Sequence, residues 1–472
     1  MTGIPDSVDV LVVGGGPAGS ATAARVARLG HSVCVVERGS NVWHRGFAQS
    51  LAPGALSVLE TLGVRDEVKA VFPRSRGVTL LWGEDRPQYR EFADAGGLEI
   101  TRAGFDRILC SATQRSGAIL LSPADVIDVR RALTRDWLAR VALNDTRFDI
   151  RARIVVDAAG RRAKVPVERI RTSLPLIGIL GLWRGSGIGE QSIVEAAADC
   201  WYWASARADS TTAAVFFDPR SGTLSEDGSL LERYRRLIAN SRLLRGLSDA
   251  TLMRVEAHDA TSRHVGDPLE PGLIRVGECA VSLDPLSSQG IQAAITSGLQ
   301  AAIVVNTWLR RPDCASAADA FYRNRHAETI QRSRDDGSRI YAEAARRYPT
   351  PFWQQRGALQ SAPDKPAVET HGRPIPHPQA RLRLASGVRV RSTPVVRDDL
   401  AVFAPAIVRS GTERPVAFLE GMPVGELAEE LVTGAAATHL VKAWSERVGE
   451  MPALKVLAWM WQAGVIVESN AA

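Results

Sequence analysis

The sequence predicts an α/β protein: a Rossmann-like nucleotide-binding domain interleaved with a β-sheet substrate domain, plus a small α-rich, winged-helix-like C-terminal domain. Three observations support this. A glycine-rich turn joins a β-branched run to a small-residue helix near the N-terminus. Segments rich in aromatic and β-branched residues fill 173–220 and are typical of strands. After a proline-rich stretch, the pattern changes to short amphipathic helices.

The domain boundaries follow from these changes in pattern. The nucleotide-binding domain is expected in three segments, and the substrate domain in two segments between them. A stretch with seven prolines is predicted to be a linker. The expected ranges are 1–80, 101–172 and 269–348 for the nucleotide-binding domain, 81–100 and 173–268 for the substrate domain, 349–378 for the linker and 379–472 for the C-terminal module.

Residues 8–37 predict a strand, a turn, a helix and a second strand. VDVLVV is the first strand, and the turn GGGPAG places Pro17 in the first helical turn, where no amide donor is needed. SATAARVARLG is the helix, which ends at Gly30, and HSVCVVE is the next strand. This is a βαβ unit of the usual length.

The turn carries the spacing G-x-G-x-x-G at Gly14, Gly16 and Gly19, and Glu37 ends the next strand, 23 residues after Gly14. In this setting the first glycine makes the turn, the second lets the backbone approach a pyrophosphate, and the third packs the helix on the strand. A carboxylate at Glu37 would hold ribose hydroxyls and argues against a 2′-phosphate. The unit therefore predicts a dinucleotide site.

A second glycine-rich motif, GECAVSLDPLSSQGIQAAI at 277–295, favours FAD over NAD. It follows the predicted strand LIRV and precedes a region, 290–347, that is largely helical in pattern. A flavin needs a second contact region because its ring lies far from the adenosine. RIVVDAAG at 153–160 is a further strand that runs into a glycine.

Composition excludes several classes of function. The chain has 472 residues, a net charge of +6 and 45% hydrophobic content, which is ordinary for a globular protein. Five widely spaced cysteines without a CxxC motif predict neither disulfides nor a metal site, and a reducing, cytoplasmic compartment is expected. The N-terminus lacks the features of a signal peptide, and no apolar run reaches about 18 residues, so no membrane span is expected.

Four motifs together resemble the flavoprotein hydroxylase superfamily, which includes flavin-dependent halogenases. They are GGGPAG with Glu37-Arg38, EITRAGFDRIL at 99–109, DAAG at 157–160 and GECA…DP…GI at 277–291. The resemblance covers about residues 8–345 and implies FAD as cofactor, O2 as oxidant, and electrons from NAD(P)H or a separate reductase.

The resemblance also implies which residues hold the cofactor. Glu278 stands where the family has an aspartate that hydrogen bonds the ribityl hydroxyls, and the amides of Gly290 and Ile291 would face the flavin pyrimidine edge. The positive helix end there would stabilise negative charge on the flavin. The expected FAD contacts are Gly14, Gly16, Pro17, Ala18, Gly19, Glu37, Arg38, Ser50, Arg102, Val126, Asp157, Ala159, Gly160, Gly277, Glu278, Pro285, Gln289, Gly290 and Ile291.

Within the superfamily, DPLSSQGI resembles the loop of flavoprotein monooxygenases that hydroxylate a protein tryptophan during tryptophylquinone biogenesis. FAQSLAPG at 47–54 resembles that subgroup's GESLPP stretch, with Ala48 and Gln49 in place of glycine and glutamate. Halogenases carry an active-site lysine that 71–83 lacks, although Trp201-Tyr202-Trp203 partly matches their W-x-W signature. The implied reaction is oxygen transfer from a flavin C4a-hydroperoxide to an indole. A halogenase and a small-aromatic hydroxylase are alternatives.

Few residues stand out as catalytic. Asp284 is the best candidate, because the motif would hold it near the flavin ring. His44, His258 and His264 are weaker candidates, since a lone histidine is more often structural. Trp201 and Trp203 lie two apart and would share one face of a strand, as core or as substrate wall.

The C-terminal module indicates partners of a different kind. From Gly421 onward, three basic residues face six glutamates, so nucleic-acid binding is not expected. A tryptophan-containing peptide or small-protein client fits better, together with other maturation enzymes. The aromatic LAWMWQAG could provide anchors or the module's own core. The arginine-rich segment 381–397 is expected to be an exposed ribbon. A non-catalytic flavoprotein scaffold for a client is the alternative outside enzymology.

Overall fold

The computed structural model describes residues 4–39, 47–92, 96–133, 135–185, 188, 192–206, 210–221, 228–358, 376–409 and 414–469. The chain forms two compact units. The first comprises residues 1–305 and 322–362, and the second comprises 306–321 and 363–472. No helix in the described residues is long and apolar enough to cross a membrane.

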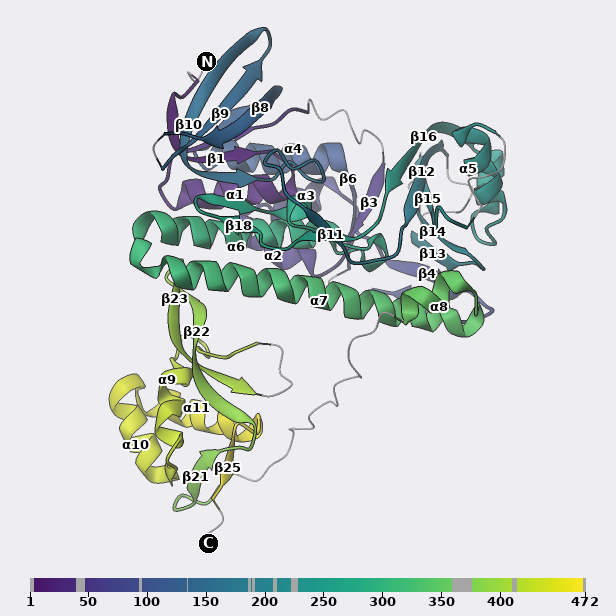
Figure 1. Cartoon of the computed structure of the whole chain (residues 1–472). Coiled ribbons are helices and arrows are strands. Elements are labelled where there is room, and N and C mark those ends of the chain that lie inside the picture. The colour runs from purple at the N-terminus through teal and green to yellow at the C-terminus, as the bar shows by residue number, and fades with distance from the viewer. Residues whose placement is uncertain are drawn as a thin grey trace. The chain divides into compact units, whose positions relative to one another are not determined.

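A mostly parallel sheet lies towards one side of the first unit, with helix α1 beside it (Figure 1). Helix α1 connects β1 to β2, and these two strands pair in parallel, which confirms the predicted βαβ unit. Because parallel strands end at one edge, the loops after β1, β2, β10 and β19 lie close together. The sheet elements are β1 (Ser7–Val13), α1 (Pro17–Arg28), β2 (Val33–Val36), β7 (Ile119–Leu121), β10 (Thr146–Asp157), β18 (Leu269–Glu270) and β19 (Leu273–Arg275).

This sheet is covered on both faces. The antiparallel strands β8 and β9 pack their apolar side chains against one face of β1, β2 and β10. Helices α1, α2 and α4 share an apolar core with the ribbon of β3 and β6. The covering elements are β3 (Ala48–Leu51), α2 (Ala55–Leu62), α3 (Arg65–Val71), β6 (Leu98–Thr101), α4 (Arg102–Arg115), β8 (Ala124–Arg131) and β9 (Trp137–Leu143).

A second, seven-stranded sheet confirms the strand-rich region expected at 173–220. Its order is β16-β12-β15-β14-β13-β4-β5, so β4 and β5 join it from an earlier part of the chain. Its strands are β4 (Gly77–Leu81), β5 (Gln88–Glu91), β12 (Ile177–Arg184), β13 (Ser192–Ala196), β14 (Cys200–Ala206), β15 (Ser210–Phe217) and β16 (Thr251–Asp259). Helix α5 (Leu230–Ala239) covers one face, with the 3-10 turn Arg245–Asp249. A separate three-stranded sheet has the order β11-β17-β20. Its strands are β11 (Arg169–Arg171), β17 (Arg263–Val265) and β20 (Val281–Ser282).

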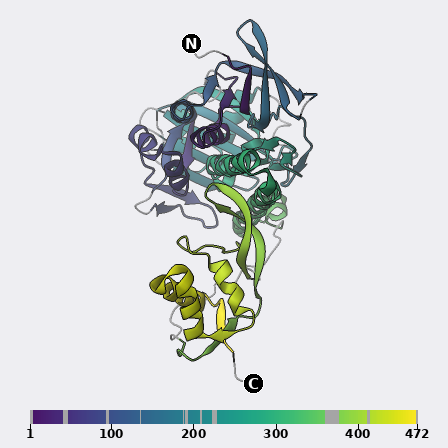
Figure 2. The same ribbon diagram turned by 90° about the vertical axis from the view of Figure 1, so that its left-hand side faces the viewer.

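Two long helices run alongside one another, as the two views in Figures 1 and 2 show. They are α6 (Gly290–Arg310) and α7 (Ala315–Arg347), which confirms the helical pattern of 290–347. The expected linker begins differently: α8 (Pro351–Gly357) is a helix whose Trp353 is fully buried in the first unit. Residues 359–375 of that segment lie outside the described residues.

The second unit contains the three expected C-terminal helices and the VIVE strand. The helices share an apolar core with a three-stranded sheet of β21, β24 and β25. Trp459 and Trp461 pack against this core, so they belong to the module's own interior. β22 and β23 form a hairpin, and the arginines of 381–397 are exposed, as expected for a ribbon. The elements are β21 (Arg381–Leu384), β22 (Val388–Arg397), β23 (Leu400–Arg409), α9 (Val424–Ala428), β24 (Ala435–Ala436), α10 (Ala437–Val448), α11 (Glu450–Gln462) and β25 (Ile466–Glu468).

Candidate active site

The glycine turn after β1 is built for close packing and leaves one side open. Gly14 has a φ of +100°, and a Cβ there would lie 2.5 Å from the Ala158 carbonyl oxygen. A Cβ on Gly19 would lie 1.9 Å from the Gly14 oxygen. Gly16 has an ordinary φ of −69° at the N-cap of α1, and nothing lies within 4 Å of its missing Cβ. Gly16 therefore forms an open cradle at a helix N-terminus.

Glu37 connects the end of β2 to this turn. The Gly15 amide donates to Glu37 Oε2 over 2.5 Å, and the Gly39 amide donates to Oε1 over 2.6 Å. Arg38, beside it, is exposed. The carboxylate is thus held at the mouth of the glycine turn, where the sequence predicted a ribose contact.

Asp157 braces the next loop and has little capacity left for a ligand. It is fully buried, and its carboxylate accepts hydrogen bonds from the amides of Ala159, Lys164 and Val165 at 2.8–3.2 Å. Cys279 Sγ lies 3.2 Å from the same carboxylate. Asp157 therefore joins the DAAG loop to the loop that begins at Gly277, and it acts on the site by positioning both.

The segment 277–291 packs against the start of α1. Gly277 has a φ of +57°, and a Cβ there would lie 2.8 Å from that of Ala18. The next side chain, Glu278, is half exposed and makes an ion pair of 3.1 Å with Arg161 from the DAAG loop. At the end of the segment, Gly290 starts the 21-residue helix α6, and nothing lies within 4 Å of its missing Cβ.

These features fit FAD. Two helix N-termini, at Gly16 and Gly290, each present an open cradle, and helix N-termini favour anions. The carboxylates of Glu37 and Glu278 are suited to hydroxyl groups of ribose and ribityl. We expect the pyrophosphate at the first cradle and the flavin ring at the second.

Four other residues were predicted to contact FAD, and the structure gives the position or hydrogen-bond partner of each. The Arg102 side chain forms two hydrogen bonds with Asp106, one turn along α4. The buried Val126 has its carbonyl occupied by Lys164 Nζ at 2.6 Å. Ser50 lies on β3, and Gln289 is exposed just before α6.

Asp284 is held at the base of the loop that leads to Gly290. It is 8% exposed and caps a short 3-10 turn by accepting from the Leu286 amide at 3.0 Å. The Tyr341 hydroxyl of α7 donates to its other oxygen at 3.1 Å. Burial raises the pKa of Asp284 and outweighs the opposing effects of these hydrogen bonds and of Arg356. The buried Asp284 carboxyl therefore holds its proton to a higher pH than an exposed aspartate does.

The remaining sequence candidates are spread out. Trp201 is 2% exposed and stacks on Phe216 with ring centroids 3.9 Å apart, so it belongs to the aromatic core. Trp203 is half-buried on the same face. The exposed His258 lies 3.1 Å from the partly buried Glu256, and His264 is half-buried at a cavity beside α7. His44 lies outside the described residues.

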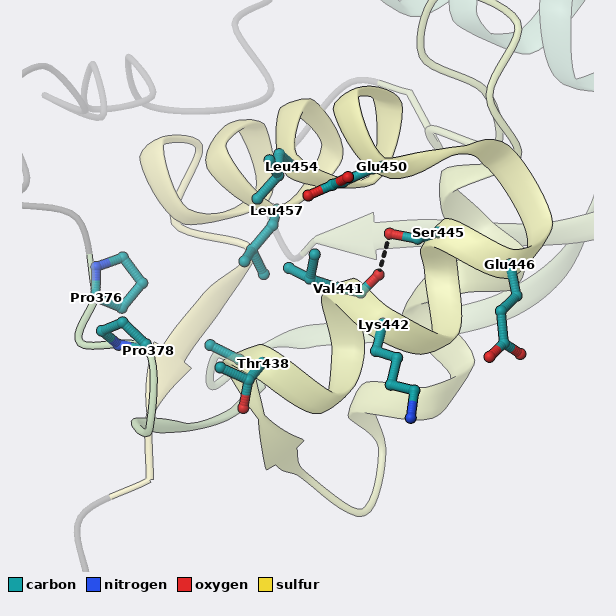
Figure 3. A pocket seen from close by; sticks show the side chains of 11 residues that line it. Pro376, Pro378, Thr438, Val441, Lys442, Ser445, Glu446, Glu450, Leu454 and Leu457 are labelled. Atoms are coloured by element: carbon teal, nitrogen blue, oxygen red, sulfur yellow. Dashed lines mark hydrogen bonds between the residues drawn. The ribbon is translucent and has the colours of Figure 1, made fainter.

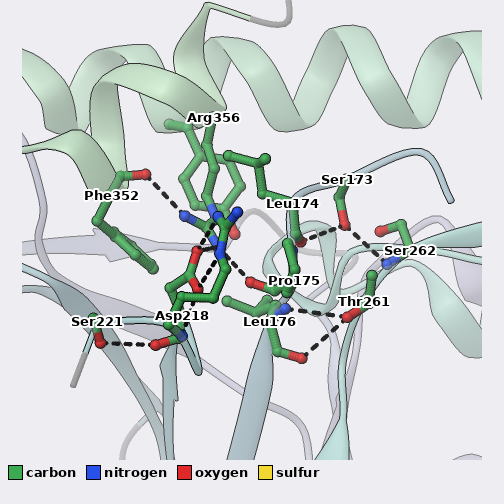
Figure 4. A network of polar contacts seen from close by, with 12 residues as sticks. Ser173, Leu174, Pro175, Leu176, Asp218, Ser221, Thr261, Ser262, Phe352 and Arg356 are labelled. Carbon is green, nitrogen blue, oxygen red and sulfur yellow. Dashed lines mark hydrogen bonds and ion pairs between the residues drawn. The ribbon is translucent and has the colours of Figure 1, made fainter. Parts of the chain in front are cut away.

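A buried ion pair joins helix α8 to the end of strand β15 in the seven-stranded sheet (Figure 4). Sequence reasoning did not predict it. Arg356 is 3% exposed and binds the Asp218 carboxylate at 3.1 Å and the Pro175 carbonyl at 2.6 Å. Hydrogen bonding from Arg220, together with Arg356, lowers the pKa of Asp218 to about 2. Asp218 and Arg356 lie 138 positions apart, so no local pattern could have indicated the pair.

The second unit has a separate groove of about 670 Å³ (Figure 3). Val441, Leu454 and Leu457 contribute apolar surface from α10 and α11, and Lys442 and Glu450 add charge. Among the described residues, no group of three or more histidine, cysteine, aspartate or glutamate side chains could hold a metal ion.

Comparison with known proteins places the fold. Residues 7–176 match the family model for an FAD binding domain. Among solved structures, the chain is similar to the peptidyl tryptophan dihydroxylase QhpG, essential for tryptophylquinone cofactor biogenesis, with a TM-score of 0.77, 27% identity and coverage of 97% of this chain and 99% of that one. It is also similar to the flavin-dependent halogenase CmlS, with a TM-score of 0.73, 19% identity and coverage of 98% and 96%. The predicted α/β fold is confirmed.

The chain is also similar in sequence to a halogenase and to an FAD-dependent oxidoreductase. The chain is 27% identical over 348 residues to tryptophan 2-halogenase from Chondromyces crocatus, a match that covers 68% of this chain and 65% of that protein, just under two thirds. It is 25% identical over 375 residues to the FAD-dependent oxidoreductase LodB from Marinomonas mediterranea, covering 75% of this chain and 98% of that protein.

Proposed function

We propose that this chain, a flavin-dependent oxidoreductase with the FAD-binding domain of the flavoprotein hydroxylases and halogenases, hydroxylates a tryptophan side chain in a peptide or protein client during quinone-cofactor maturation. The main support for the proposal is the share of the chain that matches one solved structure. The match to the peptidyl tryptophan dihydroxylase takes in 97% of the chain at 27% identity.

The matches to halogenases are weaker, one in the share of the chain that it covers and the other in sequence identity. The tryptophan 2-halogenase matches 68% of the chain, and the solved halogenase that covers nearly all of it is 19% identical, which supports the fold alone. The segment 71–83 contains Arg74 and Arg76, both exposed, and no lysine. The nearest lysine, Lys69, is half-buried on α3.

Each part of the site would have a distinct task. Bound FAD would supply the activation of oxygen. The two helix N-termini at Gly16 and Gly290 would hold the anionic parts of the cofactor. Asp284 would hold or release a proton at the base of the loop beside the flavin ring, and the aromatic core around Trp201 would keep water from that side.

Halogenation of an indole is the second candidate, and the tryptophan 2-halogenase match favours it. Both candidates share an indole as substrate class and differ in the atom transferred and in whether the indole is free. A halogenase would require chloride or bromide, and its product would gain the mass of the halogen.

The test uses the full chain with FAD, a flavin reductase and O2. The probes are synthetic peptides that each contain one central tryptophan, and free L-tryptophan, each with and without chloride and bromide. We expect peptide products that gain 16 mass units per oxygen atom at tryptophan, independent of halide. A halide-dependent product, or reaction of free tryptophan alone, would overturn the proposal. ¹⁸O2 labelling provides the control that the oxygen comes from O2.

A further inference from the structure

A small cavity lies between the Asp284 loop and helix α7. Its volume is about 40 Å³. One water molecule needs roughly 10–15 Å³ of such volume, so the cavity has room for about three, and an indole would not fit. The walls come from four segments, represented by Ser173, Ser262, Asp284 and Ser338.

One wall residue has a polar group without a partner. Among the residues that the structure describes, the buried Ser262 hydroxyl makes no hydrogen bond, although the residue is only 6% exposed. Its backbone is fully engaged: its amide donates to Ser173 Oγ at 3.0 Å (Figure 4), and its carbonyl accepts from the Thr172 amide at 3.0 Å. An unsatisfied buried hydroxyl costs about 1–3 kcal/mol unless water completes it. The hydroxyl therefore points to a water in the cavity.

Gly337 creates part of the space. It lies within the 33-residue helix α7, is buried and lines the cavity, yet nothing lies within 4 Å of its missing Cβ. A glycine inside a helix costs about 1 kcal/mol relative to alanine, and a buried position would ordinarily be filled. The space left by Gly337 is on the same wall as Tyr341, one helical turn further along.

The cavity also borders the two side chains, Asp284 and Tyr341, that would transfer a proton. Asp284 and Tyr341 both line it, and the Tyr341 hydroxyl donates to the Asp284 carboxyl at 3.1 Å. The charged or titratable groups around this pair are Arg356, which is paired with Asp218, and His264 and Arg334, which also line the cavity. Arg334 is exposed, so one lining residue of the cavity also reaches the surface.

We propose that this cavity holds about three ordered water molecules which, with Tyr341, carry protons between solvent and the Asp284 carboxyl. Each transfer moves one proton along the hydrogen bonds: the carboxyl gives its proton to the reduced oxygen species that forms at the cofactor and regains one from the adjacent hydroxyl or water, so each transfer consumes one proton from solvent. The proposal rests on FAD-dependent activity at this loop and is independent of which indole is oxygenated.

The test centres on two substitutions at one position. Gly337→Ala puts a methyl group into the space, where nothing lies within 4 Å of the added Cβ, and Gly337→Ser puts a hydroxymethyl group there, which is one oxygen atom larger. Crystal structures of the FAD-bound protein and of both variants are the first measurement. We expect waters hydrogen bonded to Ser262 Oγ in the wild type and at least one fewer in Gly337→Ala. An empty cavity in the wild type would overturn the proposal.

The second measurement is proton transfer without any client. Bound FAD is reduced, mixed with O2, and its reoxidation is followed in H2O and D2O. Positioned proton transfer contributes about 10²–10⁴-fold, so we expect Gly337→Ala to slow this reaction at least about tenfold, while its Tm rises because alanine favours the helix. Gly337→Ser should recover much of the rate, because its hydroxyl can take part in the hydrogen-bond chain.

Two further readouts keep the test decisive. Infrared difference spectra recorded against pH should show a protonated carboxyl band that Asp284→Asn abolishes and Gly337→Ala shifts. An unchanged reoxidation rate and solvent isotope effect in a Gly337→Ala protein that has lost the waters would refute the relay. Failure to oxygenate tryptophan peptides would refute the proposed function and leave these results untouched.

Discussion

Gly16→Ala is the substitution that most directly tests where FAD binds. The φ of −69° at Gly16 suits alanine, and nothing lies within 4 Å of the added methyl group. Alanine is a poorer N-cap than glycine by roughly 0.5–1 kcal/mol, and it restricts the unfolded chain by about 0.4–1 kcal/mol in the other direction. These effects cancel, so we expect the stability of the apoprotein to stay within about 0.5 kcal/mol of the wild type.

FAD affinity should respond very differently. The methyl group would occupy the open cradle at the start of α1, where the backbone is expected to approach the pyrophosphate. Filling a close contact with one extra carbon costs typically about 1–3 kcal/mol, which corresponds to a Kd raised about 5- to 150-fold. Calorimetric titration of the apoprotein with FAD measures the Kd, and denaturant unfolding of the same samples measures stability.

Gly16→Ala with unchanged FAD affinity and an intact fold would refute the placement of the cofactor at this turn. A large loss of apoprotein stability would instead refute the open space that the structure shows beside Gly16. Gly19→Ala is the contrasting variant: its methyl group would meet the Gly14 carbonyl oxygen at 1.9 Å, so it should destabilise the fold itself.

Three further predictions concern packing and charge. Gly298→Ala would place a Cβ 2.4 Å from the Ala18 carbonyl oxygen, and we expect it to lower the unfolding free energy by about 2 kcal/mol, since roughly 3 kcal/mol of overpacking exceeds about 1 kcal/mol of helix propensity. Asp218 has a pKa of about 2, below its unfolded value, so its contribution to the stability of the fold is complete above about pH 4 and is lost as pH falls towards 2. The unfolding free energy measured against pH should therefore fall by roughly 2 kcal/mol over this range, and Asp218→Asn should lack this dependence. Glu278→Asp breaks a half-exposed ion pair with Arg161, and because such pairs contribute about 0–1 kcal/mol, titration should show near-native stability and an FAD Kd within about threefold of the wild type.

Features that depend on neighbours in sequence could be predicted. The spacing of Gly14, Gly16 and Gly19 depends on the backbone geometry of one turn, and the structure has that turn between β1 and α1. The helical pattern of 290–347 likewise became α6 and α7. In both, the local chain contains all the information that the element needs, since helix periodicity and turn geometry extend over a few residues.

The proline-rich segment shows how one residue type supports two interpretations. Seven prolines between 349 and 378 predicted a linker, yet Pro351 occupies the first turn of α8, where a missing amide donor costs nothing. Trp353 then packs into the first unit. What decides between linker and helix here is burial against strands more than 100 positions earlier in the chain, and composition does not record it.

Contacts between distant residues account for what sequence reasoning missed at the site. Tyr341 was not predicted to take part, because its contact with Asp284 joins residues 57 positions apart. Asp157 was predicted to contact FAD, and the structure shows its oxygens occupied by loop amides, a role that depends on how the loop folds back. Motifs therefore indicate which cofactor to expect, whereas contacts such as those of Asp284 and Asp157 depend on pairings that only the fold reveals.

Glu278 illustrates the same distinction at a single residue. The resemblance implies an aspartate at this position, and motif reasoning offers no cause for the extra methylene. In the structure the longer side chain reaches Arg161 at 3.1 Å and joins the DAAG loop to the loop leading to α6. An aspartate would fall short by about the length of one C–C bond, roughly 1.5 Å, which puts the oxygen beyond hydrogen-bonding distance. The glutamate is therefore explained by its loop partner, and a ribityl contact would have to share the carboxylate with Arg161.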